Sequence, residues 1–193
     1  MRVVLALLAA LLVVGCTTGD DAVSRGSDFE FVAPDGKTKI FYRGADRQRM
    51  PAISGDSLMD EGKRISSEDF AGKVVVINLW GTWCGPCRSE APELERVYRK
   101  TKADGVRMLG IDVRDDRTSA QDFMRDRGLT YPSIFDPPGR SLLALRGYPR
   151  NAVPSTIVLD RQHRVSAVFL TPLLESDLLP VVRKLAGEPA KEG

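Results

Sequence analysis

Apolar residues along the chain gather in short continuous runs, and these runs predict the buried strands of a sheet. Val74–Leu79 is rich in β-branched residues, and Val106–Val113 has the same character. Runs of this kind, without polar alternation, are typical of strands that are covered on both faces. Ile157–Asp160 and Val165–Leu170 flank a turn at Asp160–His163, which predicts an antiparallel pair.

Helical periodicity lies between the first two runs. Leu94, Val97 and Tyr98 recur at i, i+3 and i+4 among arginine and glutamate residues, which predicts an amphipathic helix over 88–100. Gly105 would end this segment before the second buried strand. A strand, a helix and a second strand in this order imply a right-handed crossover between parallel strands.

Smaller elements are expected in the later part of the chain. Thr118 and Gln121 form a capping box for a helix that ends near Arg127. The charged segment before it, Arg114–Arg117, is interpreted as a solvated loop. The remaining expected elements are a strand over 131–135, a short helix over 141–145 and a last helix over 176–186 that contains Pro180.

The segment ahead of the first buried strand predicts a small extension. Phe29–Val32 and Lys39–Tyr42 flank the turn signal Pro34–Lys37, so we expect a β-hairpin there. Residues 45–57 are interpreted as a connector, and Ser66–Phe70 as a capped helical turn.

The first 28 residues have a different composition. Val3–Val14 is an apolar run that is too short to span a bilayer as a helix, which needs about 20 residues. The following residues Thr17–Asp28 are small and polar, and they read as a flexible tether.

Charge and cysteine content narrow the function classes. The chain of 193 residues has 28 Lys and Arg against 26 Asp and Glu, and no basic face of the kind that binds nucleic acid is evident. Three cysteines are present, Cys16, Cys84 and Cys87. The last two form a CxxC pair, which leaves Cys16 to be explained separately.

The CxxC pair falls at the predicted strand-to-helix junction. Unsatisfied backbone N–H groups and the positive end of the helix dipole favour a thiolate there. Cys84 is therefore expected to be an exposed nucleophile, and Cys87 an inward-facing thiol that resolves the mixed disulfide. Pro86 lies between them, where its missing N–H costs little this early in a helix.

Two alternatives to redox chemistry are a structural disulfide and half of a zinc site. A staple across so short a loop would add little stability. A zinc site needs two further ligands, and the sequence offers only His163 and Cys16, both far away. We therefore expect a redox-active Cys84–Cys87 disulfide with no metal and no other cofactor, and we interpret His163 as a solvated turn residue.

These residues resemble the thioredoxin superfamily, and more closely its TlpA/ResA-like branch of membrane-tethered thiol–disulfide oxidoreductases. The resemblance rests on Asn78 six residues before Cys84, on the segment Leu79–Cys84, and on Glu90 followed by Ala91-Pro92. It covers roughly 54–187. It implies an α/β, thioredoxin-like fold with a central mixed sheet flanked by helices, an inserted helix and strand, and here the added N-terminal hairpin.

The resemblance also implies roles for residues around the cysteines. Pro154 matches the cis-proline of the superfamily, whose preceding residue, Val153, would pair its backbone with an extended substrate segment. Trp83 is expected to form an apolar rim for substrate, whereas Trp80 is expected to be core. Glu90 would adjust proton transfer; the alternative is an exposed acid that favours the helix dipole.

The leader resembles a bacterial lipoprotein signal peptide. The segment Val13-Val14-Gly15-Cys16 is similar to a lipobox, in which the cysteine is lipidated; an ordinary signal peptide or an uncleaved anchor are the alternatives. The expected divisions are a signal peptide at 1–15, a tether at 16–28, the hairpin extension at 29–53, the thioredoxin-like domain at 54–187 and a frayed tail at 188–193. The protein is then expected outside the cytoplasmic membrane, held there by a lipid anchor.

The leading functional hypothesis is an exported dithiol reductase. Gly85-Pro86 matches thioredoxin, a reductant with a potential of about −270 mV, whereas strong oxidants have other dipeptides and potentials near about −120 mV. The resemblance implies electrons from a CcdA/DsbD-type membrane protein and the CxxCH haem site of apocytochrome c as substrate.

Two other functions are weighed beside the reductase. An oxidase or isomerase for secreted proteins would use the same site in a different direction. A peptide-binding lipoprotein would not need the cysteines at all, and its activity would survive their replacement by serine. A thiol peroxidase is disfavoured because Gly81 stands where the catalytic threonine of that family would be.

Overall fold

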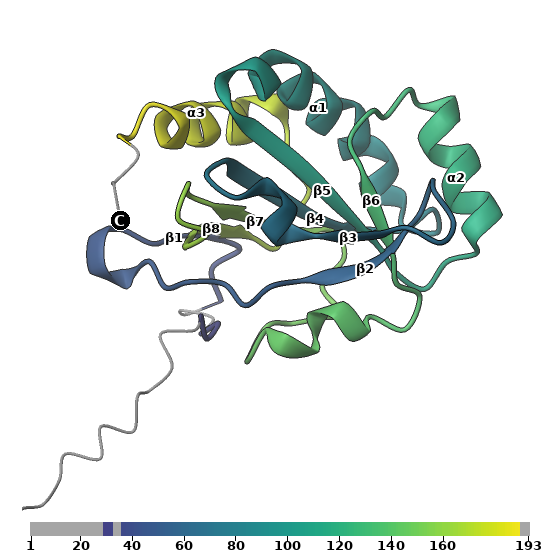
Figure 1. Cartoon of the computed structure of the whole chain (residues 1–193), viewed down its shortest axis with the longest axis horizontal. Coiled ribbons are helices and arrows are strands. Elements are labelled where there is room, and N and C mark those ends of the chain that lie inside the picture. Colours follow the sequence, from purple (N-terminus) through teal and green to yellow (C-terminus); the bar gives the residue numbers. More distant parts are fainter. Residues whose placement is uncertain (1–28, 33–35, 190–193) are drawn as a thin grey trace, which may run out of the picture.

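The computed structural model describes residues 29–32 and 36–189, and the other residues are not described here. These residues form one mixed eight-stranded sheet in the order β1-β8-β7-β4-β5-β6-β2-β3 (Figure 1). The strands are β1 (Lys39–Phe41), β2 (Ser54–Ser57), β3 (Arg64–Ser66), β4 (Val74–Trp80), β5 (Val106–Asp112), β6 (Ser133–Phe135), β7 (Ser155–Leu159) and β8 (Val165–Phe169). The α-helices are α1 (Gly85–Thr101), α2 (Arg117–Asp126) and α3 (Glu175–Ala186), and the 3-10 helices are η1 (Gly44–Asp46), η2 (Ser67–Phe70), η3 (Lys102–Asp104) and η4 (Arg140–Ala144).

The centre of the sheet is formed by β4, as its apolar run predicts. All seven residues of β4 are buried. It pairs in parallel with β5 and antiparallel with β7, so that Asn78 lies between Gly110 and Thr156. A strand that is covered by neighbours on both sides and by side chains on both faces has no solvent-facing positions, which explains the absence of polar alternation. The thioredoxin-like α/β class is confirmed.

Two apolar clusters cover the two faces of the sheet. One contains both cysteines and the inward side chains of α1, α2 and α3, such as Leu94, Met124 and Val182. The other contains the N-terminal segment and η4, represented by Phe29 and Leu142. The three α-helices accordingly lie on one side of the sheet, and the N-terminal segment and η4 lie on the other (Figure 1).

The predicted N-terminal hairpin is wrong. β1 pairs antiparallel with β8, through Ile40 opposite Val168, and not with the preceding residues. Phe29 donates its N–H to Arg49 O, and Glu30 makes an isolated parallel bridge to Arg146. The apolar residues of both segments do lie in extended chain. The turn signal between the segments does not determine their pairing, and each segment hydrogen-bonds to a different part of the protein.

A second difference concerns residues 45–57, which were interpreted as a connector. Their last four residues form β2, which pairs antiparallel with both β3 and β6 and extends the sheet on that edge. β2 is the polar sequence Ser-Gly-Asp-Ser, which carries no hydrophobic signal for a strand. The capped turn at η2 is confirmed, with Ser66 and Asp69 forming a capping box.

Two local predictions are corrected by hydrogen bonds. The helix α2 is capped by Asp116, which accepts the Ser119 N–H at 3.0 Å, and not by Thr118. His163 is 2% exposed and not solvated. Its Nε2 lies 3.1 Å from Phe70 O, because the turn folds back over η2.

The inserted elements and the last helix are confirmed. β6 pairs in parallel with β5 after α2, and α3 accommodates Pro180 inside its span. Among the described residues, no helix has the length and apolar character needed to cross a bilayer. The predicted leader, tether and most of the frayed tail lie outside the described residues, so the proposed divisions of the chain stay a prediction.

Candidate active site

The cysteine pair lies where β4 delivers the chain into α1. Cys84 is the N-cap of α1, in an extended conformation, and its Sγ accepts the Cys87 N–H at 3.2 Å. The two cysteines form a disulfide with a Cα–Cα distance of 5.2 Å. Donation by a backbone N–H at a helix N-terminus stabilises negative charge on sulfur, so this geometry supports a thiolate at Cys84 once the disulfide is reduced.

Both sulfur-bearing residues are buried in this oxidised form. Cys84 is 3% exposed and Cys87 is 2% exposed. The expectation of an exposed Cys84 is therefore wrong for the disulfide-bonded state. The reason is that the first turn of α1 belongs to the apolar cluster that also contains Trp80 and Leu173.

Trp83 is the exposed apolar residue next to the cysteines, with 46% of its surface accessible. Its indole N–H donates to Val113 O at 2.9 Å, which ties the ring to the end of β5. A Cβ on Gly81 would collide with this indole, so a glycine is required there. Trp80, by contrast, is buried, donates to Ser133 Oγ and is core, as predicted.

Glu90 is a buried acid on the inner side of α1. It is 2% exposed, which rules out the alternative of an exposed first-turn acid. Its Oε1 accepts from Asn78 Nδ2 at 2.8 Å, and its Oε2 accepts from the Leu173 N–H at 2.9 Å. Burial raises the pKa of Glu90 to about 7, while these two hydrogen bonds oppose the shift.

The spacing of Glu90 and Cys87 places the acid below the disulfide. Residues at i and i+3 share one face of a helix, so the two side chains project from α1 in the same direction. A carboxyl group whose pKa is near neutrality can exist in either form at physiological pH. Such a group is able to take up or release the proton that thiol–disulfide exchange requires.

The Val153–Pro154 peptide bond is cis, as the resemblance implied. Val153 packs against the apolar cluster that contains both cysteines. It precedes β7, and its backbone N–H has no hydrogen-bond partner among residues 29–32 and 36–189. This leaves a donor beside the disulfide that an extended polypeptide can use.

Sequence reasoning missed the part played by the loop that follows β5. Arg114–Arg117 was interpreted as solvated, but Asp115 accepts hydrogen bonds from the N–H and hydroxyl of Thr82. Arg114 stacks over Trp83, with 4.2 Å between its guanidinium carbon and the ring centroid. The order of the two predicted parallel strands could have indicated this contact. Loops that follow neighbouring parallel strands meet at one edge of a sheet, so the loop after β5 is expected next to the cysteines.

Asp112 was also missed. It is the last residue of β5, is fully buried, and neither of its carboxylate oxygens has a hydrogen-bond partner among the described residues. Burial and the nearby charge of Asp115 raise the pKa of Asp112 to about 8.

Cys16 lies outside the described residues, so the structure does not place it. Within the described part of the chain, no cluster of three or more His, Cys, Asp and Glu side chains is arranged to hold a metal ion.

Comparison with known proteins places this site in a family. The Redoxin family model matches residues 45–182. The chain is 32% identical over 115 residues to the thiol–disulfide oxidoreductase ResA of Bacillus subtilis, a match that covers 60% of this chain and 63% of that protein. The chain therefore matches less than two thirds of the length of this relative.

Two solved structures are similar over nearly their whole length. A secreted thiol–disulfide isomerase from Corynebacterium glutamicum is 50% identical, with a TM-score of 0.81, over 83% of this chain and 98% of that one. A DsbF homologue from Corynebacterium diphtheriae is 45% identical, with a TM-score of 0.78, over 82% of this chain and 99% of that one. With its thioredoxin-like fold and CxxC disulfide, the chain belongs to the Redoxin family, in the group of ResA-like thiol–disulfide oxidoreductases.

Proposed function

We propose that the protein catalyses thiol–disulfide exchange outside the cytoplasm, and that it acts as a reductase of disulfides in exported proteins. The observation that carries the proposal is the Cys84–Cys87 disulfide at the N-terminus of α1, with the Cys87 N–H directed at Cys84 Sγ. The same geometry that closes the disulfide stabilises the thiolate after reduction.

The reaction starts from the reduced pair. The Cys84 thiolate attacks one sulfur of the substrate disulfide, forms a mixed disulfide and displaces the other substrate thiolate. Cys87 then loses its proton and attacks Cys84 Sγ, which releases the second substrate thiol and restores the Cys84–Cys87 disulfide. Two electrons pass to the substrate, and a donor must return two electrons to the enzyme.

Glu90 is proposed as the acceptor of the Cys87 proton. Its position on the same face of α1, its burial and its pKa of about 7 support this role. Trp83 and the Val153 backbone are proposed to bind the substrate polypeptide on either side of the disulfide. The cis bond at Pro154 is proposed to hold Val153 in position for this contact.

The reducing direction is supported by the dipeptide between the cysteines. Gly85-Pro86 is the dipeptide of thioredoxin, whose potential is about −270 mV. We propose that a membrane protein of the CcdA/DsbD type supplies the electrons and that the oxidised haem site of apocytochrome c is the substrate. Both partners are proposed from the resemblance to the TlpA/ResA-like branch. The sequence similarity to ResA supports that resemblance.

The location is proposed from the leader and from one relative. Cys16 would carry the lipid anchor, and 16–28 would allow the domain to reach membrane partners. The similar protein of C. glutamicum is described as secreted, which supports an extracytoplasmic location.

A second candidate is an isomerase or oxidase of secreted proteins. The specific observation in its favour is that the C. glutamicum protein, at 50% identity, is described as a thiol–disulfide isomerase. The two candidates use the same cysteines and differ in the potential of the disulfide.

The resting state in cells distinguishes them. Acid quenching of intact cells, followed by thiol alkylation and resolution by mass, reports the fraction of the protein with Cys84 and Cys87 reduced. A mainly reduced pair supports the reductase, and a pair that stays oxidised in the presence of the membrane donor contradicts it. The Cys87→Ser variant, which lacks the resolving thiol, traps mixed disulfides at Cys84 and so identifies the substrates.

The potential of the disulfide is measured by equilibrating the purified protein with glutathione buffers. About −270 mV is expected for the reductase and about −180 mV or higher for the alternative.

A further inference from the structure

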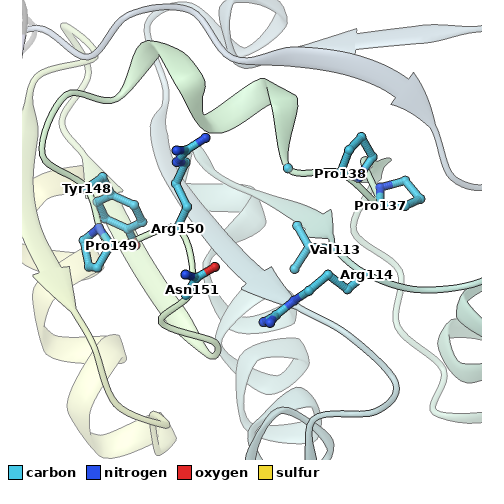
Figure 2. Close-up of a pocket in the computed structure, with 9 residues that line it drawn as sticks. Val113, Arg114, Pro137, Pro138, Tyr148, Pro149, Arg150 and Asn151 are labelled. Atoms are coloured by element: carbon cyan, nitrogen blue, oxygen red, sulfur yellow. The ribbon is translucent and has the colours of Figure 1, made fainter.

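A cavity of about 480 Å³ lies between the loop that follows β5 and the loop that leads to the cis-proline. Val113 and Arg114 line one side of it, and Arg150 and Asn151 line the other (Figure 2). Val113 is the residue whose carbonyl holds the Trp83 ring, which immediately precedes Cys84. Arg114 also lies over the Trp83 ring, so two residues that line the cavity contact the ring that we assign to the substrate surface.

The charged residues that line the cavity are all positive. It is lined by two arginines, Arg114 and Arg150, and by no acidic residue. Among the described residues, neither guanidinium has a carboxylate within 4.0 Å or donates a hydrogen bond. Some exposed arginines elsewhere are neutralised: Arg64 and Arg125, for example, each bind an aspartate. Two unneutralised guanidinium groups around one cavity create a site for an anion.

Arg114 is held in place by its surroundings. Its φ is +56°, in the left-handed region that costs a non-glycine residue about 1 kcal/mol or more. Its backbone N–H donates to Pro137 O, and its guanidinium lies over the Trp83 ring at 4.2 Å. Stacking occupies only the face of the guanidinium, so the N–H donors at its edge stay free for a carboxylate.

Prolines, whose backbone φ is restricted, make up much of the cavity walls. Pro137 and Pro138 form one wall, and Pro149 and the buried ring of Tyr148 form the other. Figure 2 shows the Arg114 and Asn151 side chains directed into the space between these walls. A cavity with fixed walls loses little conformational entropy when a ligand enters, which favours selective binding of a single side chain.

We infer that this cavity binds an acidic side chain of the substrate polypeptide, close in sequence to the disulfide that is exchanged at Cys84. Arg114 and Arg150 would hold the carboxylate, and Asn151 would add an amide donor. The substrates are accordingly polypeptides with Asp or Glu near the target cysteine. This inference rests on the proposed function, because it takes Trp83 and Val153 as the substrate surface.

The test is a binding measurement on the oxidised protein with short fluorescent peptides, by anisotropy. Two cysteine-free peptides differ only in having Glu or Gln at one position, and alanine replaces the target cysteine, so that no covalent chemistry contributes. The Glu peptide is expected to bind about tenfold more tightly than the Gln peptide at low ionic strength. This preference should shrink as salt is added.

The variants locate the preference. Arg150→Gln is expected to abolish the difference between the two peptides, whereas Arg114→Lys, which keeps the charge but loses the planar fork, should reduce it. Arg43→Gln is the matched control: it is an exposed arginine without an acidic partner among the described residues, and it does not line this cavity. It should leave the preference at its wild-type value.

Turnover of hydroxyethyl disulfide, which carries no charge, tests the proposed function separately. Equal affinity for the two peptides, or a preference that survives Arg150→Gln, overturns the inference even if hydroxyethyl disulfide is reduced. Absence of turnover together with a preference that depends on Arg150 contradicts the proposed function and keeps the cavity as an acid-binding site.

Discussion

The side-chain amide of Asn78 donates a hydrogen bond of 2.8 Å to the buried carboxyl group of Glu90. One residue lies in the middle of β4 and the other on the inner face of α1, so this bond joins the central strand to the helix that carries the cysteines. The amide also donates to Thr156 Oγ1 on β7 at 3.1 Å. The carboxyl group that we propose as the proton acceptor is therefore oriented from the centre of the sheet.

The first prediction concerns stability and pH. Burial raises the pKa of Glu90 from 4.5 to about 7. Well below pH 4.5 the carboxyl is protonated in both the folded and the unfolded chain. As the pH rises from 4.5 to 7, the unfolded chain releases the proton while the folded protein retains it, so the free energy of unfolding falls. The full loss is about 3 kcal/mol, since one unit of pKa corresponds to about 1.4 kcal/mol.

Glu90→Gln removes this loss. Urea denaturation at a series of pH values should show the unfolding free energy of the variant, minus that of the wild type, rising by about 3 kcal/mol from acid to alkaline pH. Asp112, whose pKa burial raises to about 8, is present in both proteins and cancels in the difference. Glu61→Gln, at an exposed turn, is the control for removal of a surface carboxylate. A difference that is constant with pH would contradict the buried, neutral carboxyl.

The second prediction concerns the rate of exchange. If Glu90 accepts the Cys87 proton, Glu90→Gln should lower kcat/KM for disulfide reduction by about tenfold to a hundredfold. The limb of the pH–rate profile near pH 7 should disappear with it. Circular dichroism checks that the fold is retained. Rates equal to those of the wild type across this pH range would remove the role of Glu90.

The third prediction concerns Asn78→Leu. Loss of the amide removes a hydrogen bond that favours the charged form of Glu90, so the pKa of Glu90 should rise above 7. NMR titration of carbon-13 in the glutamate carboxyl groups measures this directly. Thr156→Val is the matched control, because it removes another partner of the same amide and leaves the bond to Glu90 in place. An unchanged or lower pKa in the leucine variant would refute the contact.

The fourth prediction concerns the packing of the N-terminal segment. Gly147 has a φ of +70°, and a Cβ there would collide with the carbonyl oxygen of Phe31. Gly147→Ala should therefore lower the free energy of unfolding by about 2–4 kcal/mol, from left-handed strain plus displacement of the segment. Gly72→Ala is the control, since Gly72 has a φ of +74° but nothing within 4 Å of a Cβ. It should cost only about 1 kcal/mol. Equal losses in thermal or urea unfolding would show that the segment does not pack there.

The sequence alone determined the elements whose signal is local. The apolar run of β4, the helical period of α1 and the CxxC pair at their junction follow from neighbouring residues, and so does the fold class. The cis bond before Pro154 was predicted only from the family resemblance. Most X–Pro bonds in folded proteins are trans, so the residues by themselves do not predict a cis bond.

Only the tertiary structure decided which distant residues meet. Residues 39–41 are extended as predicted but pair with β8, and residues 54–57, which were expected to be a connector, pair with β6. Each strand covers an edge of the sheet whose backbone groups would otherwise be unpaired. His163 and Glu90 became buried, and Arg114 came to stack over Trp83, through contacts between segments that are distant in sequence. Periodicity reports which face of an element is apolar, whereas burial and charge pairing depend on what covers that face, and this is set only when the sheet is assembled.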